Sequence, residues 1–270
     1  MRALAELVMR GRLQACSIAF IGFVFPFVSS AVIGLVTLRK GSLEGFIVML
    51  WAILPVLLSY FFSENNPYLA VVSGILVLTS LLVAVVLRMV SLWDWTLMAV
   101  VLISVFLTLM SGLFFKSELA DFVQWVEEVF ELSSAGDVLV LVAMGIALNA
   151  LLGLIIARWW QALLYNQGGF QKEFHSLRLD KSVGAGCLIL ALIGMVSNNS
   201  PGVWLKLASI PLLICGIAVV HFTVKVLSLN KFWLFLMYVS MLFGTMSFIL
   251  AGVGAADSFL NLRERFTKRS

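Results

Sequence analysis

Residues 138–160 read VLVLVAMGIALNALLGLIIARWW, an apolar run that is interrupted only by Asn149 and, near its end, by Arg158. A helix needs about 20 residues to cross a hydrocarbon layer of roughly 30 Å, so this run is long enough to span a membrane. Over the whole chain 62% of the residues are apolar and only 12% are charged, and the mean hydropathy is +1.08. A water-soluble core of ordinary proportions cannot bury that much apolar surface. The sequence therefore predicts an integral membrane protein whose main partner is the lipid bilayer.

Similar apolar runs recur along the chain. We expect an all-α fold, a polytopic transmembrane helical bundle of about eight membrane segments, with residues 1–270 forming a single integral membrane domain. The expected segments are residues 13–38, 43–62, 68–90, 92–115, 138–160, 183–196, 203–227 and 232–254. The first of them contains the sequence FPF at residues 25–27. Because proline removes a backbone hydrogen bond and clashes with the preceding turn, we expect this segment to break into two short arms.

Lysine and arginine side chains lie mostly at the ends of the apolar segments. If the broken first segment returns to its starting side, most of these cations fall on one side of the membrane, and the positive-inside rule makes that side cytoplasmic. The N-terminus is then cytoplasmic. The net charge of +4 is explained by this distribution, so we expect no nucleic-acid partner.

The acidic stretch 116–136 is predicted to be an amphipathic helix on the membrane surface. Leu119, Phe122 and Val126 recur at helical spacing, with acidic side chains on the other face. Two interpretations are open: a solvated lid or linker helix, or a vestibule that attracts cations.

No motif of a catalytic, metal or cofactor site is present in the sequence. The two histidines, His175 and His221, have no neighbouring metal ligands, and the three cysteines lie in separate apolar runs without a CxxC pair. We therefore expect neither enzymatic activity nor a catalytic residue, metal or cofactor.

Asn149 is a polar residue inside a membrane segment, where such a group must be paired or face a cavity. Gly145, Asn149, Gly153 and Ala157 repeat every four residues and so share one helix face. Small residues at this spacing let two helices approach closely, and an amide can bond across the contact. Asn149 is thus either a helix-packing residue or part of a ligand cavity.

His221 and Lys225 are one helical turn apart near the end of their segment. Lys225 can extend to the cytoplasmic interface. Alternatively, both side chains face the interior beside Asn149 and bind an anionic or hydrogen-bonding ligand. The candidate ligand-binding residues are Asn149, His221 and Lys225.

The adjacent tryptophans Trp159 and Trp160 are predicted to mark the point where the chain leaves the membrane. A cytoplasmic loop follows, residues 161–182, in which Gly168 and Gly169 permit a sharp turn with positive φ. Aromatic and charged residues then alternate, which indicates a short segment docked either on the inner mouth of the bundle or on a partner protein. The candidate contact residues of the loop are Gly168, Gly169, Phe170, Phe174 and Arg178.

Four stretches carry a resemblance to a known family: MRALAELVMRGRLQA at 1–15, SSAVIGLVTLRKG at 29–41, GGFQKEFHSLRLDK at 168–181 and AADSFLNLRERF at 255–266. Together they look like the YybS-like family of uncharacterised bacterial inner-membrane proteins, over nearly the whole chain. The resemblance implies a bacterial inner (cytoplasmic) membrane location and a fold similar to the S components of energy-coupling factor vitamin transporters. S components present an Ala-x-x-x-Ala face on their first helix to a transmembrane coupling subunit, and Ala15 and Ala19, with Gly11 before them, make that spacing here.

Three functions are compatible with the sequence. The first is an S-component-like solute-binding or transport component for an unknown small molecule, docked on a coupling partner through its first helix. The second is a non-transporting scaffold or assembly factor that recruits proteins through residues 168–181. The third is an intramembrane enzyme or a lipid-handling protein, in which a basic rim holds an anionic headgroup. The rim would consist of Arg158, Lys172, Arg178 and Lys181.

Overall fold

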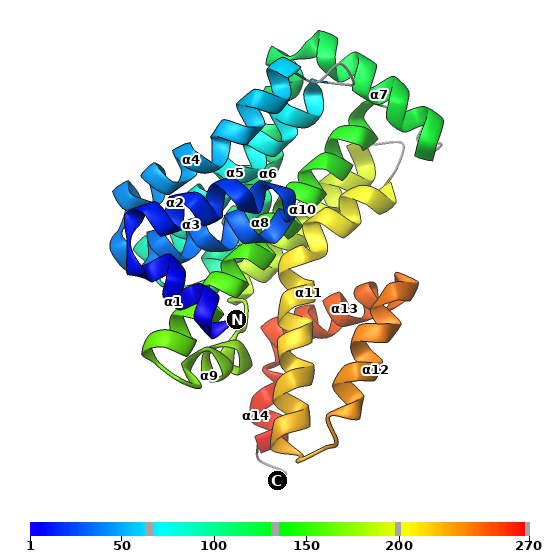
Figure 1. Ribbon diagram of the computed structural model, residues 1–270. Coiled ribbons are helices and arrows are strands. Elements are labelled where there is room, and N and C mark those ends of the chain that lie inside the picture. Colours follow the sequence, from blue (N-terminus) through cyan, green and yellow to red (C-terminus); the bar gives the residue numbers. More distant parts are fainter. Residues whose placement is uncertain (63–66, 131–134, 198–200, 268–270) are drawn as a thin grey trace. The chain divides into compact units, whose positions relative to one another are not determined.

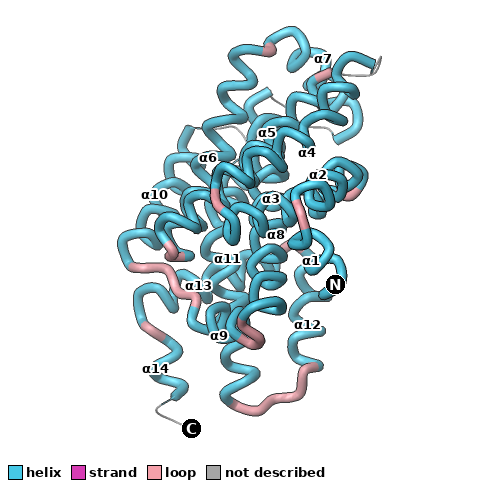
Figure 2. Tube along the Cα trace, turned by 60° about the vertical axis from the view of Figure 1, so that its left-hand side comes forward, coloured by secondary structure: helices cyan, strands magenta, loops and turns pink. Residues whose placement is uncertain are grey.

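The computed structural model describes residues 1–62, 67–130, 135–197 and 201–267 (Figure 1). Within these ranges every regular element is a helix, as Figure 2 shows, so the predicted all-α fold is confirmed. The chain forms two compact units where the sequence suggested a single domain. The first unit comprises Met1–Leu92 and Ala99–Gly168, and the second comprises Trp93–Met98 and Gly169–Ser270.

Among the described residues, five helices are long and apolar enough to cross a membrane, and a bent pair would make six. They are α4 (Ser42–Phe62), α5 (Tyr68–Val90), α6 (Trp93–Phe114), α8 (Ala135–Tyr165) and α11 (Pro201–Val226). The protein is therefore a multi-pass membrane protein, with fewer spanning helices than the eight segments expected. One reason is that α10 (Lys181–Ser197) is only a short apolar helix.

The other two expected segments are broken. In the first, α2 (Arg12–Ile21) and the 3-10 helix η1 (Gly22–Val24) are followed by α3 (Pro26–Lys40), so the predicted break at FPF is confirmed. In the last, α12 (Phe232–Ser240) and η2 (Met241–Phe243) precede α13 (Thr245–Leu260), with a bend of 118°. Gly244 lies at this bend with φ +63°, a conformation that glycine adopts without steric cost.

In the first unit, α3 packs against α2, α4, α5 and α8. Helix α1 (Arg2–Arg10) adds Ala5 and Val8 to the same core. The approach of α3 to α8 is close, because a Cβ atom added at Gly153 would lie 2.4 Å from the Cβ of Ser30. The small-residue face predicted on α8 is thus used at Gly153, but Gly145 of the same series is exposed and has no side-chain or distant backbone atom within 4 Å.

Helix α7 (Lys116–Phe130) confirms the predicted amphipathic helix over its described length, while residues 131–134 lie outside the described ranges. Phe122 and Val126 are buried against Tyr68 and Val138. The Phe122 and Tyr68 ring centroids are 5.3 Å apart. Helix α7 contacts α5 and α8 through its apolar face, and its polar face is exposed. It therefore caps the first unit.

The second unit is built around α11, which packs against α10 and α13. The two helices α11 and α13 touch backbone to backbone at two glycines. A Cβ atom at Gly216 would lie 1.8 Å from the carbonyl oxygen of Leu250, and one at Gly254 would lie 2.0 Å from that of Leu212. The short helices α9 (Gly169–Ser176) and α14 (Leu262–Thr267) also contact α11, as Figure 1 shows for α14.

Candidate functional site

Arg263, on α14, joins the two sequence motifs at 168–181 and 255–266. Its side chain is only 8% exposed. Nη1 donates a hydrogen bond of 2.7 Å to the carbonyl oxygen of His175, and Nη2 donates another to that of Leu177. Nε lies 3.3 Å from Oδ2 of Asp257, which is completely buried in α13. Residues 169–181 are therefore docked on helices of their own unit.

This environment offsets the cost of burying an arginine. Burial lowers the pKa of Arg263, and the carboxylate of Asp257 acts in the opposite direction. A guanidinium has an ordinary pKa so high that it stays protonated in proteins. A permanent positive charge is therefore fixed at this point by two carbonyls and one carboxylate.

A pocket of about 760 Å³ opens beside Arg263. We call it the basic pocket, because its ionisable lining consists of four cations, one histidine and a single acid. They are Lys172, Arg178, Lys225, Arg263, His175 and Glu264. Such a surplus of positive charge fits an anionic ligand.

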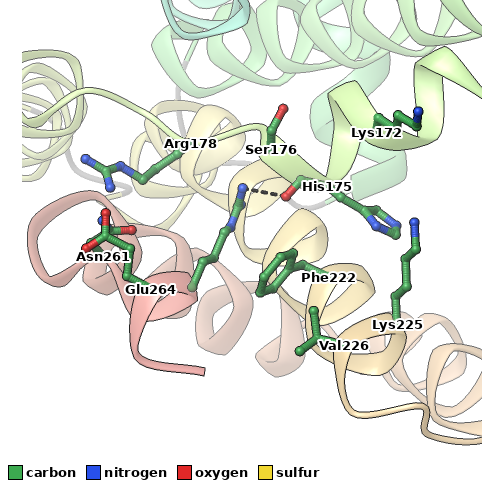
Figure 3. Close-up of a pocket in the computed structure, with 10 residues that line it drawn as sticks. Lys172, His175, Ser176, Arg178, Phe222, Lys225, Val226, Asn261 and Glu264 are labelled. Atoms are coloured by element: carbon green, nitrogen blue, oxygen red, sulfur yellow. Dashed lines mark hydrogen bonds between the residues drawn. The ribbon is translucent and has the colours of Figure 1, made fainter. Parts of the chain in front are cut away.

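The labelled charges fall into two groups (Figure 3). Lys172, His175 and Lys225 lie on one side of the pocket, and Arg178 lies with Asn261 and Glu264 on the other. Among the described residues, no salt bridge is made by Lys172 or Lys225. The side with the two lysines is thus the part of the pocket where positive charge is least compensated.

His175 is 9% exposed, on the last turn of α9. Burial lowers the pKa of its imidazole, and the positive charges of Lys225, His221 and Arg263 lower it further. The ring is therefore neutral at pH 7, when it has one donor and one acceptor nitrogen.

Of the predicted ligand-binding residues, Lys225 lines the basic pocket and His221 does not. His221 Nε2 is 2.8 Å from the hydroxyl oxygen of Tyr238, and its ring meets Phe174 edge to face. Asn149 belongs to the first unit. Its Oδ1 accepts a hydrogen bond of 2.7 Å from Ser30 Oγ, and Ser80 Oγ donates to the same serine oxygen at 2.9 Å. These bonds join α3, α5 and α8, the arrangement expected of a helix-packing residue.

The predicted docking face on the first helix is covered by the chain itself. Ala15 and Ala19 are buried in the core of the first unit, and Ser29 Oγ donates to the Ala19 carbonyl at 2.7 Å. Gly11 lies between α1 and α2, with an extended backbone. Ala15 and Ala19 are therefore core positions in the described conformation, and docking through them would require the helices packed against α2 to move.

The loop residues from Gly169 onward belong to the second unit, and Gly168 is the last residue of the first unit. Gly168 has φ +79°, as predicted, whereas Gly169 begins α9 and has no positive φ. The rings of Phe170 and Phe174 are 5.9 Å apart. Arg178 lines the basic pocket.

The two tryptophans predicted as interfacial anchors lie in different environments. Trp160 is buried in the core of the first unit, whereas Trp159 is exposed. Trp93 is also buried, and its Nε1 donates a hydrogen bond to Glu173 of α9. The large apolar surface of an indole can fill a core as well as an interface.

Asp257 and Arg263 are site residues that sequence reasoning missed. An ionisable side chain in an apolar helix is costly unless it is paired, so Asp257 could have indicated a buried cation nearby. Its partner follows six residues later, across the helix end at Asn261. Comparison of the chain with family models, with curated proteins and with solved structures finds no match.

Proposed function

We propose that this chain is a bacterial inner-membrane protein, with a cytoplasmic N-terminus, that binds an anionic ligand in the basic pocket. The observation that carries the proposal is the convergence of Lys172, Lys225 and the buried Arg263 on one pocket. The cytoplasmic position of the pocket follows from the positive-inside rule, because the loop that supplies Lys172 and Arg178 is basic.

Two features of this site would favour the binding of an anion. Hydrogen bonds between charged groups contribute about 1.5–3 kcal/mol each, roughly twice the value for neutral pairs. In addition, Arg263 is held by fixed partners, so part of the site needs no reorganisation when the ligand arrives.

The proposal is tested by the thermal unfolding of the purified protein in nanodiscs of phosphatidylcholine. We expect citrate and pyrophosphate to raise the unfolding midpoint in a saturable manner, because ligands that bind only the folded state stabilise it. The uncharged solute glycerol should have no such effect. The variant with both Lys172→Gln and Lys225→Gln should lose most of the shift. If no anion gives a saturable shift, the proposed function is wrong.

A role as an S-component-like transport component is the second candidate. Two apolar segments are discontinuous, at η1 and at the 118° bend beside Gly244. Discontinuous helices free backbone groups and recur at transport sites. A photo-crosslinker placed at Leu13, an exposed residue of α2, should label a transmembrane coupling subunit in native membranes. Labelling confined to lipid would count against this role.

A further inference from the structure

We infer that the ligand of the basic pocket is a phosphate monoester, with its phosphate at Lys172, His175 and Lys225 and its organic part along Phe222 and Val226. This inference rests on the proposed anion-binding function. It adds the chemical class of the ligand and the orientation in which it binds.

The first argument concerns charge. Lys172 comes from α9 and Lys225 from α11, and Figure 3 shows Lys225 beside the His175 ring and Lys172 farther along the same side of the pocket. The acid of the pocket lining, Glu264, lies on the opposite side. The neighbouring acid Glu173 accepts a hydrogen bond from Trp93. Two ammonium groups thus lie on the side of the pocket away from the carboxylate of its lining.

The second argument concerns the valence of the anion. A phosphate monoester carries a charge of about −1.5 to −2 at pH 7 and presents three acceptor oxygens. A diester or a carboxylate carries a single negative charge and has two such oxygens. Because Coulomb energy is proportional to charge, a dianion gains about twice as much from the same pair of lysines. The neutral His175 ring can supply one further N–H donor.

The third argument concerns the rest of the ligand. Phe222 and Val226 lie on α11 on either side of Lys225, and the membrane-spanning part of α11 ends at Val226. A ligand whose phosphate binds Lys225 therefore places its carbon skeleton beside an apolar wall at the membrane interface. The volume of about 760 Å³ is in the range of pockets that hold ligands of drug size, so an organic group accompanies the phosphate.

The test compares four probes on the full-length protein in phosphatidylcholine nanodiscs, by microscale thermophoresis. The probes are glycerol 3-phosphate, dioctanoyl phosphatidic acid, dioctanoyl phosphatidylglycerol and octanoate. We expect at least one monoester to bind roughly tenfold or more tightly than the diester and the carboxylate, which corresponds to one charged hydrogen bond. Tighter binding of phosphatidic acid identifies a lipid headgroup as the source, and equal binding of both monoesters identifies a soluble ester.

Matched variants locate the phosphate. Lys172→Gln and Lys225→Gln should each weaken monoester binding by roughly tenfold. Lys181→Gln is the control, because Lys181 is exposed and does not line the pocket. All three lysines are exposed, so the variants should fold, which the unfolding midpoint verifies. Equal affinity for phosphatidylglycerol and phosphatidic acid would overturn the inference and leave the anion-binding function standing. Absence of saturable binding for every anion would overturn both.

Discussion

At the scale of one residue, the largest expected loss of stability follows from substituting Arg263. Removing one member of a buried ion pair leaves the other charge uncompensated and costs about 3–5 kcal/mol. We therefore expect Arg263→Gln to destabilise the protein by about 3 kcal/mol, since Asp257 is completely buried beside it. Unfolding of the protein in detergent by a graded denaturant measures the change.

A second substitution separates charge from packing at this position. Adding Asp257→Asn to Arg263→Gln removes the stranded carboxylate, so the double variant should recover part of the lost stability. If the two substitutions were simply additive, the ion pair would not be the source of the effect.

The protonation of His175 should make the stability of the protein depend on pH. Burial and the charges of Lys225, His221 and Arg263 lower the pKa of the folded-state imidazole below its ordinary value of 6.5. Between the two pKa values the unfolded chain binds a proton that the folded chain does not, so acid favours unfolding. The contribution is complete above about pH 6.5 and is lost as the pH falls through the folded-state pKa.

The measurement is the unfolding midpoint between pH 8 and pH 5. The variant His175→Gln should show a shallower decline than the unmodified protein, and its main-chain carbonyl can still accept the bond from Arg263. His221→Gln tests one of the causes, because His221 contributes to the lowering of the His175 pKa, and it should make the decline shallower by a smaller amount. An unchanged slope in His175→Gln would contradict the assignment.

The sequence predicted individual site residues only in part. Lys225 could be assigned either to the cytoplasmic interface or to a ligand site, and the structure places it in the lining of the basic pocket. Asn149 could be assigned either to packing or to a cavity, and only the Ser30 bond distinguishes the two. Asp257 could have indicated a cation such as Arg263 nearby, but the contacts of Arg263 with His175 and Leu177 could not be found, since they span 88 and 86 residues of sequence. No local pattern encodes such a contact.

At the scale of helices, the crossing of α11 and α13 depends on glycine. Gly254→Ala would place a Cβ atom 2.0 Å from the Leu212 carbonyl oxygen, so the helices must separate. We expect a loss of stability of about 1–3 kcal/mol, the usual cost of overpacking. Gly252→Ala is the matched control on the same helix, because its Cβ would meet no side-chain or distant backbone atom within 4 Å.

The control should be neutral or slightly stabilising, since alanine is favoured over glycine in helices by up to about 1 kcal/mol. Thermal unfolding of both variants in the same detergent gives the comparison. Equal effects of the two substitutions would show that the close crossing does not contribute to stability.

The positions of helices were predictable where an apolar run has the length of one membrane span. Residues 68–90 and 92–115 were expected as segments and form α5 and α6 nearly residue for residue. Residues 232–254 were equally apolar, yet they bend by 118° at Gly244. Hydropathy reports that a residue prefers lipid, but the direction of the helix axis is set by backbone angles and packing.

At the scale of the whole molecule, α7 and α9 should lie on opposite sides of the membrane if α8, which lies between them in the chain, crosses it. We expect Ser117→Cys on α7 to react with an impermeant maleimide in intact spheroplasts, and Gln171→Cys on α9 to react only after permeabilisation. Both positions are exposed. The native cysteines Cys16, Cys187 and Cys215 are buried and need not be replaced. Identical labelling of the two positions would mean that α8 does not cross the membrane.

The anchoring of α9 by Arg263 also has a consequence for biosynthesis. Arg263 is translated 86 residues after Leu177, whose carbonyl it holds. The α9 loop therefore leaves the ribosome without its final restraint, and the wall of the pocket that it forms is completed only when α14 arrives. A messenger truncated before codon 263 would yield a membrane-inserted protein in which this wall of the basic pocket is never completed.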